Sequence, residues 1–300
     1  MIDYSKFCEI LNKHIFEGEK RELLKKIAEH PERFIGLFRP SKPGTKILQH
    51  LLQSYEIRFG DAFEELIEEI LKDLGYEILP KNITTANGER LSLDQFFTDG
   101  RTYYFIEQKI RDDHDSSKKR GQVANFKAKL EEIFRQYKKS NISGIIYFID
   151  PDLMKNKIFY ENELERLREY YGDGVSLYLF YGKELFDFLK APQYWENLLD
   201  YLSTWKKSLP EIPQINFDIE PIKTFEEIKN LEIRYWRKLL ENEKLWEEGI
   251  IKAIFRSGET LELLVNYFNE QKELRPYQKL SRLLKERLMS YYQGALSNNQ

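Results

Sequence analysis

Two carboxylates and a lysine stand at a spacing that suits phosphate chemistry. Asp94 is followed, after twelve intervening residues, by Glu107-Gln108-Lys109. On a β-strand, Glu107 and Lys109 project from the same face because side chains alternate with period two. A hairpin turn at residues 98–101 would return the second strand beside the first and bring Asp94 to the same end of the sheet. Two converging carboxylates form an oxygen site suited to Mg²⁺, with the Lys109 ammonium near any bound phosphate or water.

The spacing by itself also fits a solvated salt bridge, which is the commoner origin of Glu-x-Lys on a strand. Three neighbouring features favour a functional site. Residues 103–106 are apolar, so the charged residues begin where the strand leaves the core. Residues 111–122 are polar, as expected of a loop that donates hydrogen bonds to phosphates. An acidic helical segment, residues 60–66, precedes these strands and could supply a third carboxylate.

The elements around this run predict an α/β fold, a mixed sheet flanked by helices. Strands are expected at Tyr76–Leu79, Leu91–Phe97, Thr102–Ile110, Ile142–Ile149 and Val175–Tyr181. Helices are expected at Gln49–Gly75, Lys118–Tyr137, Glu161–Tyr171 and Lys183–Leu189.

Helical segments precede and follow this predicted core. The periodicity predicts helices at Tyr4–Phe16, Lys20–His30, Trp195–Trp205, Phe225–Gln271 and Pro276–Gly294. A proline-bearing stretch near residues 205–222 marks the expected boundary. The predicted organisation is therefore a helical N-terminal region (1–50), a core (51–205) and a helical C-terminal region (222–300).

Composition and charge exclude several classes of protein. The 47 basic and 50 acidic residues give a net charge of −3, which argues against a histone-like coat for nucleic acid. Residues 109–139 nevertheless carry ten basic and five acidic residues, a local charge of +5. The apolar runs are too short to cross a bilayer, and residues 1–7 lack the apolar stretch of a signal peptide. A single cysteine, Cys8, excludes a disulfide framework, so we expect a cytoplasmic protein that enters no membrane.

The run from Asp94 to Lys109 resembles the motif of the PD-(D/E)XK nuclease superfamily, with Leu93 at the position of the motif's proline. The helix–strand–hairpin–strand–helix–strand order is similar to the core of that superfamily. Residues 107–122 and 178–186 resemble type II restriction endonucleases in particular. Residues 232–238 resemble the C-terminal helices of HindIII-type enzymes, whereas the main resemblance covers residues 58–190.

The resemblance implies a sequence-specific, Mg²⁺-dependent endonuclease that cuts both strands of DNA and leaves 5′-phosphate ends. Asp94 and Glu107 would be the Mg²⁺ ligands, joined by the backbone carbonyl of Gln108. Lys109 would orient the attacking water and steady the charge on the scissile phosphate.

Further residues are implied around this centre. Glu64 would be an auxiliary acid, with Glu65 as the competing choice because one residue turns a helix by about 100°. The amides that begin the helix near residue 118 are expected to bind phosphates. Two members of the DNA-contacting set, Arg39 and Lys42, also fit an ordinary exposed connector. That set comprises Arg39, Lys42, Arg111, Ser116, Ser117, Lys118, Lys119, Arg120 and Gln122.

Partners follow from the same resemblance. A palindromic target implies a two-fold homodimer, and a restriction–modification system implies a cognate DNA methyltransferase. Residues 222–300 would serve DNA recognition or dimerisation. Leu231, Tyr235, Leu239 and Leu240 stand at helical spacing and suit either a dimer interface or packing within the chain. Two alternatives stay open: a structure- or damage-directed nuclease, and a non-catalytic DNA-binding protein.

Overall fold

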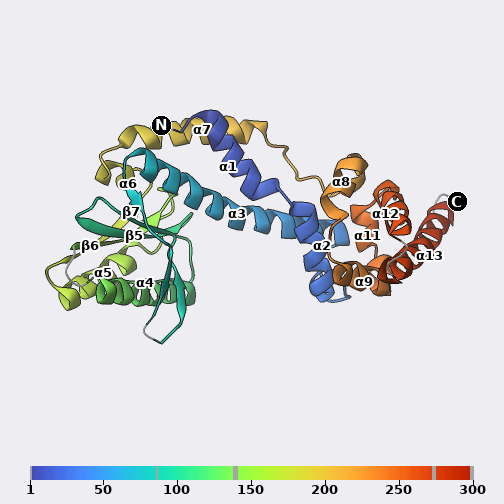
Figure 1. Ribbon diagram of the computed structural model, residues 1–300, viewed down its shortest axis with the longest axis horizontal. Coiled ribbons are helices and arrows are strands. Elements are labelled where there is room, and N and C mark those ends of the chain that lie inside the picture. The colour runs from blue at the N-terminus through green and yellow to red at the C-terminus, as the bar shows by residue number, and fades with distance from the viewer. Residues whose placement is uncertain (1, 86, 138–140, 272–274, 298–300) are drawn as a thin grey trace. The chain divides into compact units, whose positions relative to one another are not determined.

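Two compact units make up the computed structural model, which describes residues 2–85, 87–137, 141–271 and 275–297 (Figure 1). The first unit comprises Met1–His14 and Arg58–Leu209, and the second comprises Ile15–Ile57 and Pro210–Gln300. Residues 15–57, which the sequence analysis placed mostly in a separate N-terminal region, thus belong with the C-terminal helices. The helices α1 (Tyr4–Phe16) and α3 (Pro43–Asp73) contribute residues to both units.

A five-stranded mixed sheet forms the centre of the first unit. Its strands lie in the order β1-β4-β5-β6-β7. The pairs β1–β4 and β4–β5 are antiparallel, whereas β5–β6 and β6–β7 are parallel. The bounds are Glu77–Ile78 for β1, Gln95–Thr98 for β4, Thr102–Lys109 for β5, Asn141–Phe148 for β6 and Val175–Tyr181 for β7. The predicted α/β class, with a mixed sheet flanked by helices, is confirmed.

Helices cover both faces of this sheet (Figure 1). On one side lie α4 (Ser116–Gln136) and α5 (Lys157–Tyr171). On the other lie α6 (Lys183–Phe188), α7 (Pro192–Ser208) and the part of α3 within this unit. The strands fit this sandwich because adjacent side chains take opposite faces. Phe105 of β5 contacts Phe126 of α4, whereas its neighbour Tyr104 contacts Phe188 at the end of α6.

The strand predicted over Leu91–Phe97 is in fact two strands. Residues Arg90–Ser92 form β3 and pair with β2 (Asn82–Thr84) in a separate two-stranded sheet. The chain bends at Leu93 and Asp94 before β4 begins. The division follows from the side chains, because Phe96 and Phe97 are both buried and so need cover on both faces. Alternating residues 90–92 suit a ribbon with one face exposed.

The second unit is helical. A buried apolar cluster joins α2 (Glu19–Glu29), Phe34 at the end of the short 3₁₀ segment η1 (Pro31–Arg33), the 3₁₀ segment η2 (Phe217–Ile219), and the C-terminal helices. The helix predicted over residues 225–271 is broken into shorter pieces, partly at Gly249 and Gly258, whose positive φ angles interrupt a helix. These pieces are α8 (Pro221–Ile228), α9 (Ile233–Glu241), α10 (Glu243–Glu247), α11 (Ile250–Ile254) and α12 (Glu259–Glu270), followed by α13 (Arg275–Ser297).

The residues weighed for a dimer interface pack within their own unit. Leu231, Tyr235, Leu239 and Leu240 are all buried in the helical cluster. Packing Leu and Tyr side chains against the neighbouring helices removes their apolar surface from water within one chain. These four residues therefore offer no exposed apolar stripe to a second copy.

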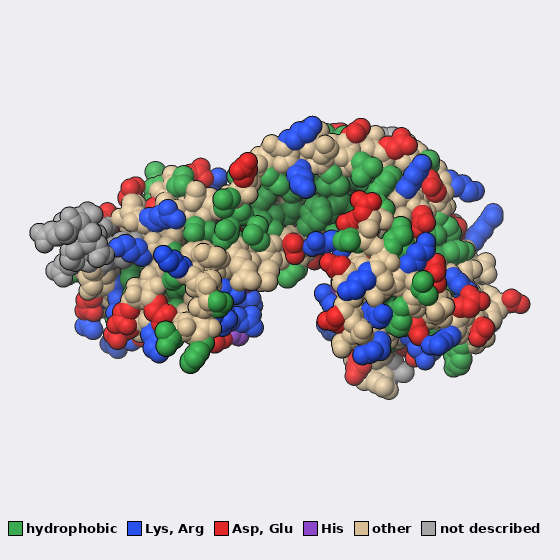
Figure 2. All heavy atoms as spheres, turned by 180° about the vertical axis from the view of Figure 1, so that it is seen from behind, with side chains coloured by type: hydrophobic (Ala, Val, Ile, Leu, Met, Phe, Trp, Pro, Cys, Tyr) green, Lys and Arg blue, Asp and Glu red, His purple; other side chains and the backbone are tan. Residues whose placement is uncertain are grey.

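Neither sign of charge dominates the face of the molecule drawn in Figure 2. On the side shown in Figure 2, basic and acidic side chains are interspersed over both units. In the ranges that the structure describes, no helix combines the length and the apolarity that crossing a membrane requires.

Candidate active site

The end of β5 brings the predicted motif residues together. Gln95 pairs with Ile106 in the β4–β5 ladder, so Asp94 lies one step beyond it, at the level of Glu107. The Asp94 carboxylate accepts hydrogen bonds from the Gln108 amide at 2.7 Å and from the Lys109 ammonium at 3.0 Å. The bend before β4 therefore places Asp94 across the end of β5, as the hairpin argument required.

Lys109 contacts two of the oxygens that the resemblance assigns to a metal. Its Nζ lies 3.0 Å from Asp94 Oδ2 and donates to the Gln108 carbonyl oxygen at 2.6 Å. Burial alone lowers the pKa of Lys109, but the nearby carboxylates, above all Asp94, outweigh burial and raise that pKa. The ammonium is therefore charged, and it marks a point where two oxygens already stabilise a cation.

Glu107 has a partner that the sequence analysis missed. The Lys129 ammonium of α4 forms an ion pair with Glu107 Oε1, and Lys129 and Glu107 are only 4% and 7% exposed. Burial and the Asp94 carboxylate raise the pKa of Glu107, while Lys129 acts in the opposite direction. One signal was available in the sequence: Lys129 falls on the apolar stripe of α4, three residues after Phe126 and four before Ile133.

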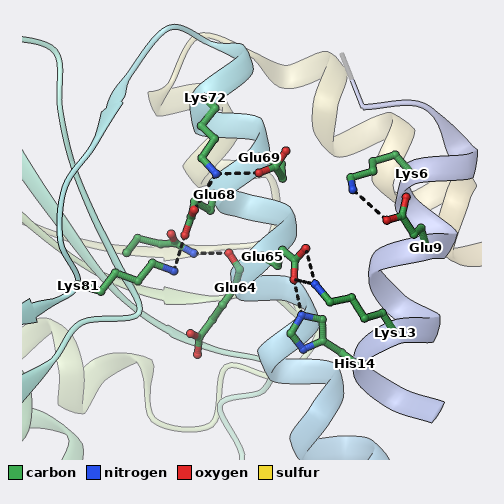
Figure 3. Close-up of polar contacts among 11 residues, drawn as sticks. Lys6, Glu9, Lys13, His14, Glu64, Glu65, Glu68, Glu69, Lys72 and Lys81 are labelled. Carbon is green, nitrogen blue, oxygen red and sulfur yellow. Dashed lines mark hydrogen bonds and ion pairs between the residues drawn. The ribbon is translucent and has the colours of Figure 1, made fainter. Parts of the chain in front are cut away.

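The structure separates Glu64 from Glu65, its neighbour on α3. Figure 3 shows the Glu65 side chain directed at Lys13 and His14 of α1, and the Glu64 carboxylate directed elsewhere. Glu65 contacts the His14 ring at 2.5 Å and accepts from Lys13 at 3.2 Å. Burial tends to raise the pKa of Glu65, but these two partners outweigh it and lower that pKa.

Glu64 instead shares the electrostatic environment of the motif. Burial, followed by the Asp94 carboxylate, raises the pKa of Glu64 to about 7. Its backbone carbonyl accepts a hydrogen bond of 2.7 Å from the buried Gln95 side chain, which ties α3 to β4. Of the two acids that the sequence left open, Glu64 is the one whose ionisation depends on Asp94.

The oxygen atoms of these acids and of the Gln108 carbonyl are of the chemical type that binds a hard divalent cation. Glu64, Asp94 and Glu107 form a set in which Asp94 raises the pKa of both other acids, so the site favours added positive charge. Carboxylate and carbonyl oxygens are the ligands that Mg²⁺ prefers. In the described part of the chain, however, no group of three or more His, Cys, Asp or Glu side chains is arranged to hold a metal. The two motif carboxylates are each paired with a lysine instead.

The start of α4 differs from the expected phosphate site. Asp115 caps this helix, and its carboxylate accepts from the amides of Ser117 at 3.0 Å and Lys118 at 2.8 Å. Those amides were expected to be open to a phosphate. An internal cap satisfies them and places a negative charge at the helix end.

Two of the other predicted DNA contacts, Lys119 and Gln122, have partners within the first unit. Lys119 donates to Asn156 Oδ1 at 3.1 Å and lies over the ring of Phe159. Gln122 accepts a hydrogen bond from the Tyr160 hydroxyl. The remaining predicted residues of this segment are exposed or half-buried: Arg111, Ser116, Ser117, Lys118 and Arg120. Arg39 and Lys42 are exposed in the second unit, between η1 and α3.

Residues 109–139, whose local charge is +5, do not form one basic face. Lys109 and Lys129 are paired with the motif carboxylates. Arg135 pairs with Glu132 on α4. Two further lysines of the segment, 138 and 139, lie outside the described residues. The local excess of positive charge thus serves in part to balance acids inside the first unit.

A second buried acid fixes the connection that follows β5. Asp112 is fully buried, and its carboxylate accepts from the backbone amide and the side-chain amide of Asn156, both at 2.8 Å. The Tyr181 hydroxyl donates to the same carboxylate at 3.0 Å. Asn156 also donates to the carbonyl of His114 at 3.1 Å. Sequence reasoning treated residues 111–122 as one polar loop and gave Asp112 no role.

A sheet of this order, with an acid on the preceding helix and Asp94, Glu107 and Lys109 at the end of one hairpin, defines a restriction-endonuclease-like fold. The family model described as "Type II restriction endonuclease, HinfI" matches residues 3–89 and 77–206. The chain belongs to this family of type II restriction endonucleases. No curated protein matches the chain. Residues 232–238, which resemble HindIII-type enzymes, lie beyond the matched residues.

Proposed function

We propose that this type II restriction endonuclease hydrolyses phosphodiester bonds in both strands of DNA with Mg²⁺ and leaves 5′-phosphate ends. One observation carries the proposal: Asp94, Gln108 and Lys109 are in direct contact at the end of β5, next to the buried Glu107. The family match favours a restriction enzyme over a structure- or damage-directed nuclease or a non-catalytic DNA-binding protein.

The oxygens at the end of β5 would hold the metal. Asp94, Glu107 and the Gln108 carbonyl are the proposed ligands, and Mg²⁺ when bound would neutralise phosphate charge and acidify a water molecule. Lys129 occupies Oε1 of Glu107, so it fixes that carboxylate and leaves Oε2 for another partner. Glu64, with a pKa of about 7, would act as the auxiliary acid.

Lys109 would act on the water and on the phosphate. Its ammonium lies beside Asp94 and is held charged by the surrounding carboxylates. A fixed cation at this point orients the attacking water and stabilises the negative charge that grows on the phosphate oxygens. The water oxygen bonds to phosphorus and the bond from phosphorus to the 3′ oxygen breaks, so the phosphate stays on the 5′ end.

Two partners complete the proposal. A palindromic target presents two antiparallel strands, so a two-fold dimer would supply one active site to each strand. A DNA methyltransferase of the same specificity would protect the host's own copies of that target.

The test uses the full chain and DNA of varied sequence. With Mg²⁺, the wild-type protein is expected to cut plasmid and phage DNA into discrete fragments that DNA ligase rejoins without prior phosphorylation. Chelation with EDTA should stop the reaction. Asp94→Asn, Glu107→Gln and Lys109→Met should each lower the cleavage rate by at least about a thousandfold, because each removes a group that acts on the transition state.

Glu65→Gln is the matched control, because it removes a neighbouring acid that is already committed to Lys13 and His14. This variant should cut like the wild type. DNA that stays intact across all substrates would contradict the proposal, and so would normal cutting by Lys109→Met.

A further inference from the structure

An apolar pair occupies the tip of a tight turn in the helical unit. The amide of Arg39 donates to the carbonyl of Gly36 at 3.2 Å, which places Leu37 and Phe38 at the two corner positions of the turn. Their side chains are 93% and 99% exposed. Turn corners usually carry Gly, Pro, Asn, Asp or Ser, so two adjacent large apolar residues there are not explained by turn formation.

The base of this turn is anchored to the unit. Phe34 is buried in the helical core, and its ring lies edge-on to His50 at 5.4 Å. The Gly36 amide donates to the carboxylate of Glu248 at 2.9 Å. The Arg39 guanidinium donates to the Glu32 carbonyl at 2.7 Å. The chain therefore holds Leu37 and Phe38 away from the core, although the buried Phe34 lies only a few residues earlier.

The chain on either side of the tip is basic, although the Glu248 carboxylate lies at the Gly36 amide. Residues 31–46 contain four basic side chains and one acidic side chain. The acid, Glu32, lies 3.4 Å from the His30 ring. Arg33, Arg39 and Lys42 are exposed. Such a surface is complementary to a polyanion that also offers apolar surface between its charges.

We propose that the turn Gly36–Arg39 is a DNA-contacting wedge. Leu37 and Phe38 enter a groove and pack against the bases, while Arg33, Arg39 and Lys42 neutralise the flanking phosphates. Leu and Phe are among the side chains that proteins insert between base steps, and a base offers an aromatic ring a stacking face. The inference rests on DNA as the substrate, and it adds a contact in the helical unit, distant in sequence from the catalytic motif.

Substitution with tryptophan tests the contact directly. Phe38→Trp places a fluorescent ring at the tip, and Ile222→Trp is the matched control. Ile222 is 72% exposed on α8 of the same unit, and its neighbour Lys223 is paired with Glu220 at 3.2 Å. With EDTA present to prevent cutting, a random-sequence duplex should quench the added emission of Phe38→Trp and shield the introduced indole from acrylamide. The added emission of the control should respond to neither.

Affinity and its salt dependence separate the two kinds of contact. Replacing Leu37 and Phe38 together with Ala should weaken duplex binding about tenfold at every salt concentration, as loss of one base-stacking contact does. Replacing Arg39 and Lys42 together with Gln should reduce the slope of log K against log salt by up to about two units, at roughly 0.9 per phosphate.

The outcomes distinguish this inference from the proposed function. A wild-type protein that binds DNA without cutting it refutes the nuclease activity and leaves the fluorescence test intact. The wedge alone is overturned by a different result, in which the wild type cuts DNA normally. In that result, DNA does not shield the indole of Phe38→Trp, and replacing Leu37 and Phe38 with Ala does not change the affinity. Shielding of that indole without DNA, growing with protein concentration, overturns it too, because the tip would then contact a second copy.

Discussion

One buried acid of the helical unit and the two motif acids of the α/β unit have different partners. In the helical unit, the Asp218 carboxylate accepts hydrogen bonds from the backbone amides of Ser257, Gly258 and Thr260 at 2.8–3.1 Å. In the α/β unit, Asp94 and Glu107 are paired with the lysine side chains of Lys109 and Lys129, and Asp94 also accepts from the Gln108 amide.

Under the proposed function, the kind of partner separates Asp218 from the acids that would hold the metal. The amides around Asp218 belong to the start of α12, so they cannot leave the carboxylate unless that helix end unfolds. An ammonium on a four-carbon chain can move within the native fold. In the proposed function, such a lysine can shift to admit a metal or a substrate beside its carboxylate, which the amides of a helix end cannot do.

The largest expected effect on stability comes from breaking the Glu107 pair. Lys129→Met should lower the free energy of unfolding by about 3–5 kcal/mol, because it leaves a buried carboxylate without its counter-charge. Urea denaturation measures this change. Adding Glu107→Gln to Lys129→Met should restore most of the stability but no cleavage. If Lys129→Met is as stable as the wild type, the ion pair between Lys129 and Glu107 contributes nothing to the stability of the fold.

A smaller loss is expected at the structural acid. Asp218→Ala should lower the free energy of unfolding by about 2 kcal/mol, since it leaves backbone amides at the start of α12 without their acceptor. The cleavage rate per folded molecule should stay at the wild-type value when measured well below the melting temperature. A loss of cleavage in fully folded Asp218→Ala would show that the distinction between the two kinds of acid fails.

The smallest effect is expected from metal binding itself. Mg²⁺ at ten times its dissociation constant should stabilise the wild-type protein by roughly 1.4 kcal/mol, as linkage requires for a ligand of the native state. Thermal unfolding with and without Mg²⁺ measures it. Asp218→Ala should show the same gain and Asp94→Asn should show none. An equal gain in Asp94→Asn would place the Mg²⁺ elsewhere.

Much of the α/β unit could be predicted from local patterns. The strand predicted at Val175–Tyr181 is β7 with the same bounds, because a continuous apolar run between turns suits a buried parallel strand. The spacing also predicted that Asp94 reaches the same end of the sheet as Glu107, and the β4–β5 register places it there, since hairpin geometry fixes which residues lie opposite one another.

Most features that local patterns missed depend on long-range contacts. The break between β3 and β4 accompanies the pairing of Arg90–Ser92 with β2, a partner that the alternation of residues 91–97 does not identify. The sequence analysis counted Lys129 only in the charge of residues 109–139, and the fold placed it against Glu107, twenty-two residues earlier in the chain. One missed feature is local: α4 begins at Ser116 because Asp115 caps it, and a cap leaves no mark in the apolar periodicity.

The hydrogen bonds of the buried Asp112 bear on how the sequence of this chain can evolve. Asp112 is held by Asn156 and Tyr181, so the segment that follows Lys109 is fastened without help from the side chains of Ser116, Ser117, Lys118 or Arg120. Substitutions at those four positions leave the hydrogen bonds of Asp112 intact. The exposed residues at the start of α4 can therefore change during evolution while the position of Lys109 is conserved.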